Sequence, residues 1–384
     1  MHAFSIENFK KYKIEILFGF ALAIILFDRF RFGGRIGLGE VLLAAVAYIS
    51  FLIIMLNFSK IRIDNIGIKY SLLLNLFLLL CMIPNTIWST LYSDYPGSSI
   101  LELFAYTSCF VFLLTISLLR LNHNVIGAVA VFVSVSLSYA FLGNTEAWYG
   151  DVRFSGGSNN PNRLAIYLLS SVVIISQLQI RSVQKFILFA IISLLILITL
   201  SDAARLGFIA MFLSFIFLSG YRSRYILPIY LCIAFLLTVF ISINFNALYL
   251  LAIDLWYAAS NSNMRFNLIV NGIQAWTEHP LTILIGHGSG AFSGYLGPYE
   301  GWESHSNIVD ILSIGGIVGF SLFYIPIIYS IFHFHKGNNH FAASALIGLL
   351  IFSFFAFIAR HPIIWFAIYI SLMNSSTLTT NAKR

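Results

Sequence analysis

The segment around Arg205 places one charged side chain between two strongly apolar runs. Arg205 follows Leu200-Ser-Asp-Ala-Ala, a short connection, so its guanidinium should lie close to the hydrocarbon boundary if both runs cross a membrane. A charge at that depth is costly and usually functional, and a guanidinium binds phosphate oxygens through two parallel hydrogen bonds. The plainer alternatives are a side chain that reaches back to the interface and an ion pair with Asp202, three residues earlier.

Three further arginines lie in polar segments. Arg265 is the only Lys or Arg of the hydrophilic stretch 246–305, where a solvated or locally paired side chain is the competing explanation. Arg153 and Arg163 flank a turn-rich stretch, and Asn162 with Arg163 opens the next apolar run, where a helix N-terminus favours anions. These residues are candidates for holding phosphate or sugar hydroxyls, although polar turns are ordinary at helix starts.

His305 ends the hydrophilic stretch, in Glu303-Ser-His-Ser, directly before an apolar run. Imidazole takes up a proton near neutral pH, so a histidine at a membrane–water junction is a candidate general base, with Glu303 beside it. A capping or interfacial histidine is the alternative. His279 and His287 are predicted to be turn residues.

The sequence shows no metal-binding or nucleotide-binding motif. It lacks His-Glu-x-x-His, paired cysteines and Gly-Lys-Ser/Thr, and the glycine run 286–290 is not a dinucleotide fingerprint. Cys81, Cys109 and Cys232 lie within apolar runs and are interpreted as small hydrophobic residues. We therefore expect chemistry without a metal or cofactor.

The elements that must position these residues are membrane helices. Of the 384 residues, 59% are hydrophobic and 10% are charged, against about 25% charged in a soluble domain. With a mean hydropathy of +0.89, this composition excludes a soluble enzyme, a disordered protein and a disulfide scaffold. We predict an all-α polytopic membrane protein, residues 1–384 forming a single membrane domain with about twelve spanning helices. The apolar runs are 14–28, 41–58, 71–89, 100–119, 125–143, 164–180, 186–201, 206–220, 226–245, 306–332, 341–359 and 361–375.

The two kinds of basic residue separate between alternate loops. With a cytoplasmic N-terminus, 14 of the 22 basic residues fall inside and 8 outside; every lysine is inside. This bias predicts that both termini are cytoplasmic and that 246–305, with short interfacial helices, lies on the far side between the ninth and tenth spans. It also accounts for the net charge of +7 without a nucleic-acid partner. The eight basic residues predicted on the far side are Arg29, Arg31, Arg35, Arg153, Arg163, Arg205, Arg265 and Arg360.

Four segments between residues 153 and 319 form an ordered series. They are 153–165 with its Asn-Pro-Asn-Arg-Leu-Ala ending, 201–207, the stretch 265–290 with Trp-Thr-Glu-His-Pro, and His305 with two later glycines. In this order and in a twelve-helix frame, the chain resembles the bacterial O-antigen ligase/O-antigen polymerase superfamily of integral-membrane glycosyltransferases. The extra Ala pair in 201–207 departs from the family pattern.

The resemblance implies a membrane glycosyltransferase of the GT-C type in the bacterial inner membrane, with its active site facing the periplasm. It implies a metal-independent, inverting reaction whose donor is an oligosaccharide on undecaprenyl diphosphate. Carried over, Arg205 and Arg265 hold the diphosphate and stabilise the leaving group, and His305 activates the acceptor hydroxyl. By position, the expected substrate-binding residues are Arg153, Asn162, Arg163 and Glu303.

The acceptor distinguishes several functions. A polymerase uses a second lipid-linked repeat unit, and we favour it because chains of this length with so idiosyncratic a first half are common in that branch. A ligase uses lipid A–core, and a third relative attaches glycans to protein. A chain-length regulator is a further partner that the resemblance admits.

A flippase or permease for lipid-linked oligosaccharide is the alternative outside enzymology. A transporter should place charges near the middle of several helices. Here Glu102 and Asp310 lie near predicted helix ends, and Asn75 is expected to make a helix–helix hydrogen bond. A flippase would tolerate loss of His305, whereas a transferase would not.

Overall fold

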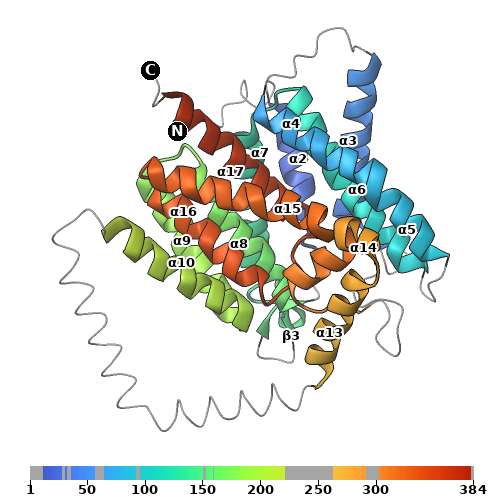
Figure 1. The fold of residues 1–384 in the computed structure, drawn as a ribbon. Coiled ribbons are helices and arrows are strands. Elements are labelled where there is room, and N and C mark those ends of the chain that lie inside the picture. Colours follow the sequence, from blue (N-terminus) through green and yellow to red (C-terminus); the bar gives the residue numbers. More distant parts are fainter. Residues whose placement is uncertain are drawn as a thin grey trace.

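The computed structural model describes residues 12–27, 31–32, 36–56, 65–91, 96–149, 153–158, 160–220, 263–290 and 302–381. Over these ranges the chain is a body of packed helices with two short hairpins (Figure 1). The hairpins pair β1 (Arg31–Phe32) with β2 (Ile36–Gly37) and β3 (Trp148–Tyr149) with β4 (Arg153–Phe154). The helices are α2 (Lys13–Ile24), α3 (Leu38–Leu56), α4 (Ile66–Phe77), α5 (Ile83–Thr90), α6 (Pro96–Leu118), α7 (His123–Ala140), α8 (Pro161–Gln177), α9 (Ser182–Ile198), α10 (Asp202–Gly220), α13 (Asn263–Thr277), α14 (Pro280–Ile285), α15 (Asn307–Lys336), α16 (His340–Ser353) and α17 (Pro362–Asn381).

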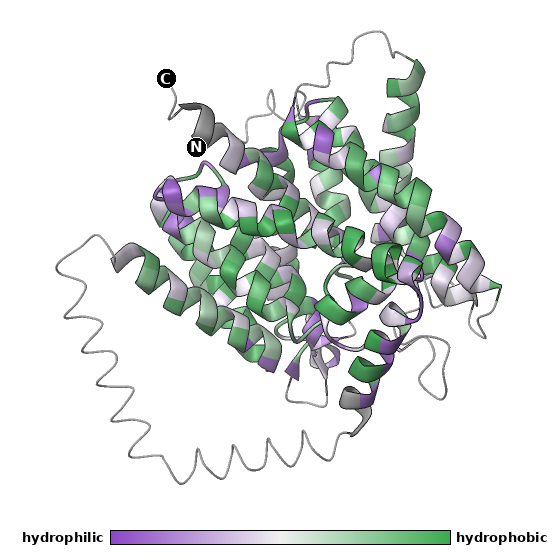
Figure 2. Cartoon of the chain, in the orientation of Figure 1, coloured by the Kyte–Doolittle hydropathy of each residue, from purple (hydrophilic) through white to green (hydrophobic). Residues whose placement is uncertain are grey.

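Hydrophobic residues predominate along most of these helices (Figure 2), which confirms the all-α membrane class. Within the described ranges, six helices are long and apolar enough to cross a membrane: Leu38–Leu56, Ile66–Thr90, Ser99–Leu118, His123–Ala140, Asp202–Gly220 and Asn307–Lys336. Three shorter apolar helices are Ser182–Ile198, His340–Ser353 and Pro362–Ser376. The count of twelve spans stays a prediction, and the predicted run 226–245 lies outside the described residues.

The predicted span 71–89 is longer than expected and contains a π-helical turn. Helix α4 continues through Leu78–Met82 into α5, so that one helix runs over Ile66–Thr90. Pro84 follows this turn. Proline has no backbone N–H to donate, and in a regular helix its ring clashes with the preceding carbonyls; the wider turn relieves that clash. The predicted hydrogen bond of Asn75 is confirmed, since its side-chain amide donates to the Phe110 carbonyl of α6 (2.9 Å).

The predicted span 341–359 is wrong at its C-terminal end, because α16 stops at Ser353. Asn307 accounts for this: its side-chain oxygen accepts hydrogen bonds from the backbone N–H groups of Ile358 (3.0 Å) and Ala359 (2.8 Å). Proline also disfavours helical geometry in the residue that precedes it, and Pro362 begins α17. The first residue of α15 therefore fixes the connection between α16 and α17.

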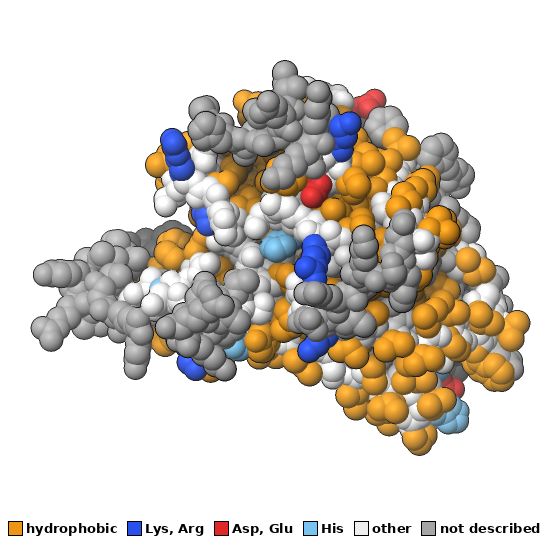
Figure 3. Space-filling view, turned by 90° about the horizontal axis from the view of Figure 1, so that it is seen from above, with side chains coloured by type: hydrophobic (Ala, Val, Ile, Leu, Met, Phe, Trp, Pro, Cys, Tyr) orange, Lys and Arg blue, Asp and Glu red, His pale blue; other side chains and the backbone are white. Residues whose placement is uncertain are grey.

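The described basic residues occupy opposite ends of the helical body. Arg163 at the start of α8 bonds to Ile25 at the end of α2, and Arg360 before α17 pairs with Glu303 before α15. At the other end, Lys185 at the start of α9 bonds to Ser176 at the end of α8. We call these two regions the arginine end and the lysine end. The lysine end is uppermost in Figure 1, and Figure 3 views it from above, with basic side chains set apart from one another.

Candidate functional site

Arg153 and Asn162 lie together at the arginine end, as a shared site requires. The β3–β4 hairpin sets Arg153 opposite Tyr149, and its guanidinium donates to the Asn162 side-chain oxygen (3.0 Å). A second bond runs from Arg153 Nε to the Thr199 carbonyl after α9 (3.2 Å). Asn160 caps α8 by accepting from the Asn162 N–H (2.8 Å). Arg153 therefore links the start of α8 to the turn that leads into α10.

Arg205 lies in the first turn of α10 rather than in the connection, which corrects its expected place. Its side chain is 38% exposed and pairs with Asp202 at 3.7 Å, and Asp202 is 87% exposed. An ion pair this open to solvent stabilises a protein by at most about 1 kcal/mol. The positive end of the helix dipole and this weakly held guanidinium together favour an anion here.

Arg163 points inward instead of toward an open site. Its guanidinium donates to the Ile25 carbonyl (3.2 Å) and lies 3.5 Å from Glu40 Oε1 of α3, with 14% of the side chain exposed. Glu40 Oε2 in turn accepts from the Gly37 N–H (3.0 Å). Arg163 thus ties α8 to the α2–α3 connection, a role in packing.

Glu303 forms an ion pair with Arg360, which sequence reasoning did not select as a site residue. Glu102 of α6 and Asp310 of α15 also act electrostatically within this group. We call Glu303, Glu102 and Asp310, together with Arg360, the carboxylate cluster. The Arg360 side chain is 42% exposed; partial desolvation opposes its charge, but the carboxylates of Glu303 and Glu102 raise the pKa of its guanidinium, so it stays protonated. Among the described residues, nothing hydrogen-bonds the buried Glu102 Oε1 or Asp310 Oδ2.

His305 lies exposed beside this cluster on a strained turn. Its φ of 59° is in the left-handed region, which costs a non-glycine residue about 1–3 kcal/mol and persists only where the surroundings enforce it. The surroundings here are Asp310, whose Oδ1 accepts from the Ser304 N–H (2.8 Å), and Ser304, whose hydroxyl accepts from the Ser306 N–H (3.1 Å). A fully buried carboxylate therefore fixes the backbone that presents the imidazole.

His361 is a buried neighbour that sequence reasoning missed. Its ring is 4% exposed and makes an edge contact with Tyr167 of α8, with centroids 6.1 Å apart. Burial, with the charges of Arg163 and Arg360, lowers the pKa of His361 well below 6.5, so the imidazole stays neutral. The only local signal was the Arg-His-Pro sequence that follows an apolar run.

The glycine run 286–290 packs into a break in α15. Gly316 has a φ of 58°, and the N–H groups of His287 and Gly288 donate to the Ser313 and Ile314 carbonyls, both at 2.8 Å. His287 is not the simple turn residue we expected. Its ring is 9% exposed, and its Nε2 lies 2.7 Å from the Ala275 carbonyl and 3.1 Å from Glu278.

The remaining predicted residue is Arg265, whose backbone belongs to α13. This helix packs against α15, but the side chain of Arg265 lies outside the described residues. Cys81 and Cys109 are free thiols, as predicted, and Cys232 also lies outside the described part. Within the described ranges, no three His, Cys, Asp or Glu side chains are grouped so that they could hold a metal ion.

No protein-family model matches this chain, and no curated protein is significantly similar to it.

Proposed function

We propose that the protein is a membrane glycosyltransferase of the GT-C type, an O-antigen or surface-polysaccharide polymerase of the bacterial inner membrane. It joins undecaprenyl-diphosphate-linked oligosaccharide units on the periplasmic face, with both termini in the cytoplasm. The observation that carries the proposal is the exposed imidazole of His305 on a left-handed turn fixed by Asp310, at the end of the body that holds the arginines.

The reaction is a displacement at the anomeric carbon of the donor sugar. The acceptor hydroxyl oxygen attacks that carbon from the face opposite the diphosphate, and its proton passes to the His305 imidazole. The bond from the anomeric carbon to the diphosphate oxygen breaks, and its electron pair leaves with the phosphate. A new glycosidic bond of inverted configuration forms, and no metal is required.

The arginines serve the leaving group. Arg205 gives up a weak pair with Asp202 for a diphosphate oxygen, and Arg265 supplies a second guanidinium. Pre-placed positive charge is most effective where negative charge develops in the transition state. Arg153 and Asn162, already hydrogen-bonded to one another, bind the donor's polar groups beside α10.

Glu303 and Asp310 support His305 in different ways. Asp310 is a positioning residue, since it holds the Ser304 N–H and thereby the turn. Glu303 binds sugar hydroxyls at the edge of the site while Arg360 fixes its carboxylate. Arg163 is assigned to packing rather than to the substrate, because it faces Glu40 and Ile25.

The test is transfer by purified protein in nanodiscs that contain an undecaprenyl-diphosphate oligosaccharide from the native strain, with and without lipid A–core. A ladder from the donor alone establishes the polymerase. Product only in the presence of lipid A–core makes the enzyme a ligase. Absence of product from folded protein in both samples overturns the transferase and favours a flippase.

His305→Ala separates catalysis from structure. Loss of a general base should reduce transfer about 10²–10⁴-fold while donor binding persists. His279→Ala is the matched control, because His279 is also exposed but begins the neighbouring helix α14. Equal activity of the two variants would contradict the assignment of His305.

A further inference from the structure

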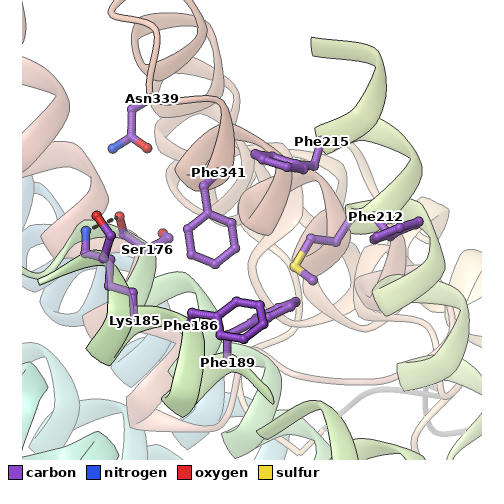
Figure 4. A pocket seen from close by; sticks show the side chains of 10 residues that line it. Ser176, Lys185, Phe186, Phe189, Phe212, Phe215, Asn339 and Phe341 are labelled. Carbon is purple, nitrogen blue, oxygen red and sulfur yellow. Dashed lines mark hydrogen bonds between the residues drawn. The ribbon is translucent and has the colours of Figure 1, made fainter. Parts of the chain in front are cut away.

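A groove of about 540 Å³ lies at the lysine end, away from the proposed active site. It runs between α9, α10 and the start of α16, and five phenylalanines line it (Figure 4). The volume falls within the range of about 300–1,000 Å³ that is common for small-molecule sites. The lining phenylalanines are Phe186, Phe189, Phe212, Phe215 and Phe341.

Packed rings form the back of the groove, and the rings at its outer edge are exposed among the described residues. Phe341 makes edge contacts with Phe189 (5.5 Å) and Phe215 (6.1 Å), which fixes these rings. The outer rings of Phe186 and Phe212 are 71% and 50% exposed. Among the described residues, only 17% of the apolar window of α10 is buried, so most of the surface of this helix is open in that part of the chain. The outer edge of the groove is therefore apolar and open within the described part of the chain.

The mouth of the groove carries positive charge. Lys185 lines it, and one of its three ammonium donors bonds to the Ser176 carbonyl at 3.2 Å. Ser182 and Asn339, at the starts of α9 and α16, also line the groove, so the partial positive charge of two helix N-termini lies beside it. The lining residues include no Asp or Glu among those described.

We propose that this groove binds an anionic phospholipid, with one acyl chain against the phenylalanines and the phosphate at Lys185. An apolar slot with a basic rim between membrane helices matches both parts of such a lipid. A zwitterionic lipid offers the same chains with less net attraction to the mouth. The site is independent of the glycosyl transfer proposed above, because it lies at the opposite end of the helical body.

Native mass spectrometry of the protein in detergent, with phosphatidylglycerol and phosphatidylcholine of identical chains, tests the proposal. We expect phosphatidylglycerol to bind the wild type more tightly. Lys185→Gln should reduce that preference about fivefold, the effect of one basic residue near an anionic surface. Lys69→Gln is the control, since Lys69 is an exposed lysine of α4 outside the groove.

A second variant tests the acyl part. Phe186→Ala removes an outer ring that is mostly exposed. It should weaken the binding of both lipids to the same extent, while the preference for phosphatidylglycerol remains. The proposal is overturned if the wild type binds both lipids equally, or if Lys185→Gln and Lys69→Gln lower the preference alike. Loss of donor turnover in Phe186→Ala with unchanged lipid binding would also overturn it, by indicating the polyprenyl tail as the occupant.

Discussion

The arginine end and the lysine end of the helical body use positive charge in different ways. At the arginine end several guanidinium groups are paired with carboxylates, as Arg163 is with Glu40 and Arg360 with Glu303. At the lysine end the ammonium groups contact carbonyls and rings instead, as Lys185 does with Ser176 and Lys336 with the Phe332 ring (5.5 Å). The planar guanidinium fixes geometry, whereas the flexible ammonium supplies charge near lipid.

Among the described residues, the arginine end is held by ion pairs between helix connections, and the proposed catalytic residues lie there. Ion pairs at the arginine end hold connections between helices, and these connections present His305 and Arg153. Substitutions at that end should therefore change stability through packing and pairing.

Gly316→Ala should produce the largest loss, about 3 kcal/mol or more, at the arginine end. A Cβ here would lie 2.4 Å from the Leu284 carbonyl carbon, and the backbone is left-handed. The measurement is unfolding by SDS titration in mixed micelles. Gly143→Ala is the control, because no heavy atom lies within 4 Å of its added Cβ. Equal stability of the two variants would contradict the packing of α14 against α15.

Arg360→Met should cost about 2–3 kcal/mol, since it leaves buried carboxylates without their cation. The value is below that of a fully buried pair because 42% of the Arg360 side chain is exposed. Adding Glu303→Gln to this variant should recover part of the loss in the same titration. If the two losses simply add, the pair does not stabilise the arginine end.

The contribution of His361 to stability should fall as the pH drops below about 6.5. The unfolded imidazole takes up a proton there, whereas the pKa of the folded one is lowered well below 6.5 by burial and by Arg163 and Arg360. Its contribution is fully present above pH 6.5 and is lost on acidification. His361→Gln should flatten the stability curve between pH 7 and about pH 5. An unchanged slope would show that His361 is protonated in the fold.

Arg205→Gln should change stability least, by less than about 0.5 kcal/mol, because its pair with Asp202 is exposed. Transfer should nevertheless fall about 10²–10³-fold if the guanidinium meets the leaving diphosphate. Asp202→Asn, which removes the partner and keeps the arginine, should retain transfer. A stability loss in Arg205→Gln as large as that of Arg360→Met would make Arg205 a packing residue.

Much of the fold could be predicted, because apolar runs and their breaks carry the signal for membrane helices. Eleven of the twelve predicted runs overlap described helices, and the remaining run lies outside the described residues. The errors fall at helix ends. The helix starting at Asp202 includes Arg205, and α16 stops early because Asn307 binds the following backbone.

The candidate site was predicted only in part. Its arginines and His305 stood out because charge next to an apolar run is costly and therefore visible in the sequence. Arg360 was identified only as a far-side arginine, and His361 was not identified at all. The partner of Arg360 is Glu303, and His361 lies near Arg163 and Tyr167. These residues are distant in the chain, so no local sequence pattern links them.

Composition and chain order were enough to predict a membrane protein and the segregation of its lysines from its far-side arginines. Composition decides whether a chain can cover itself with polar groups, and the placement of lysine and arginine follows chain order. Only the tertiary structure decided which arginines are occupied by carboxylates and which remain weakly held. That distinction depends on distances between helix ends that packing brings together, such as Arg163 with Glu40 and Arg360 with Glu303.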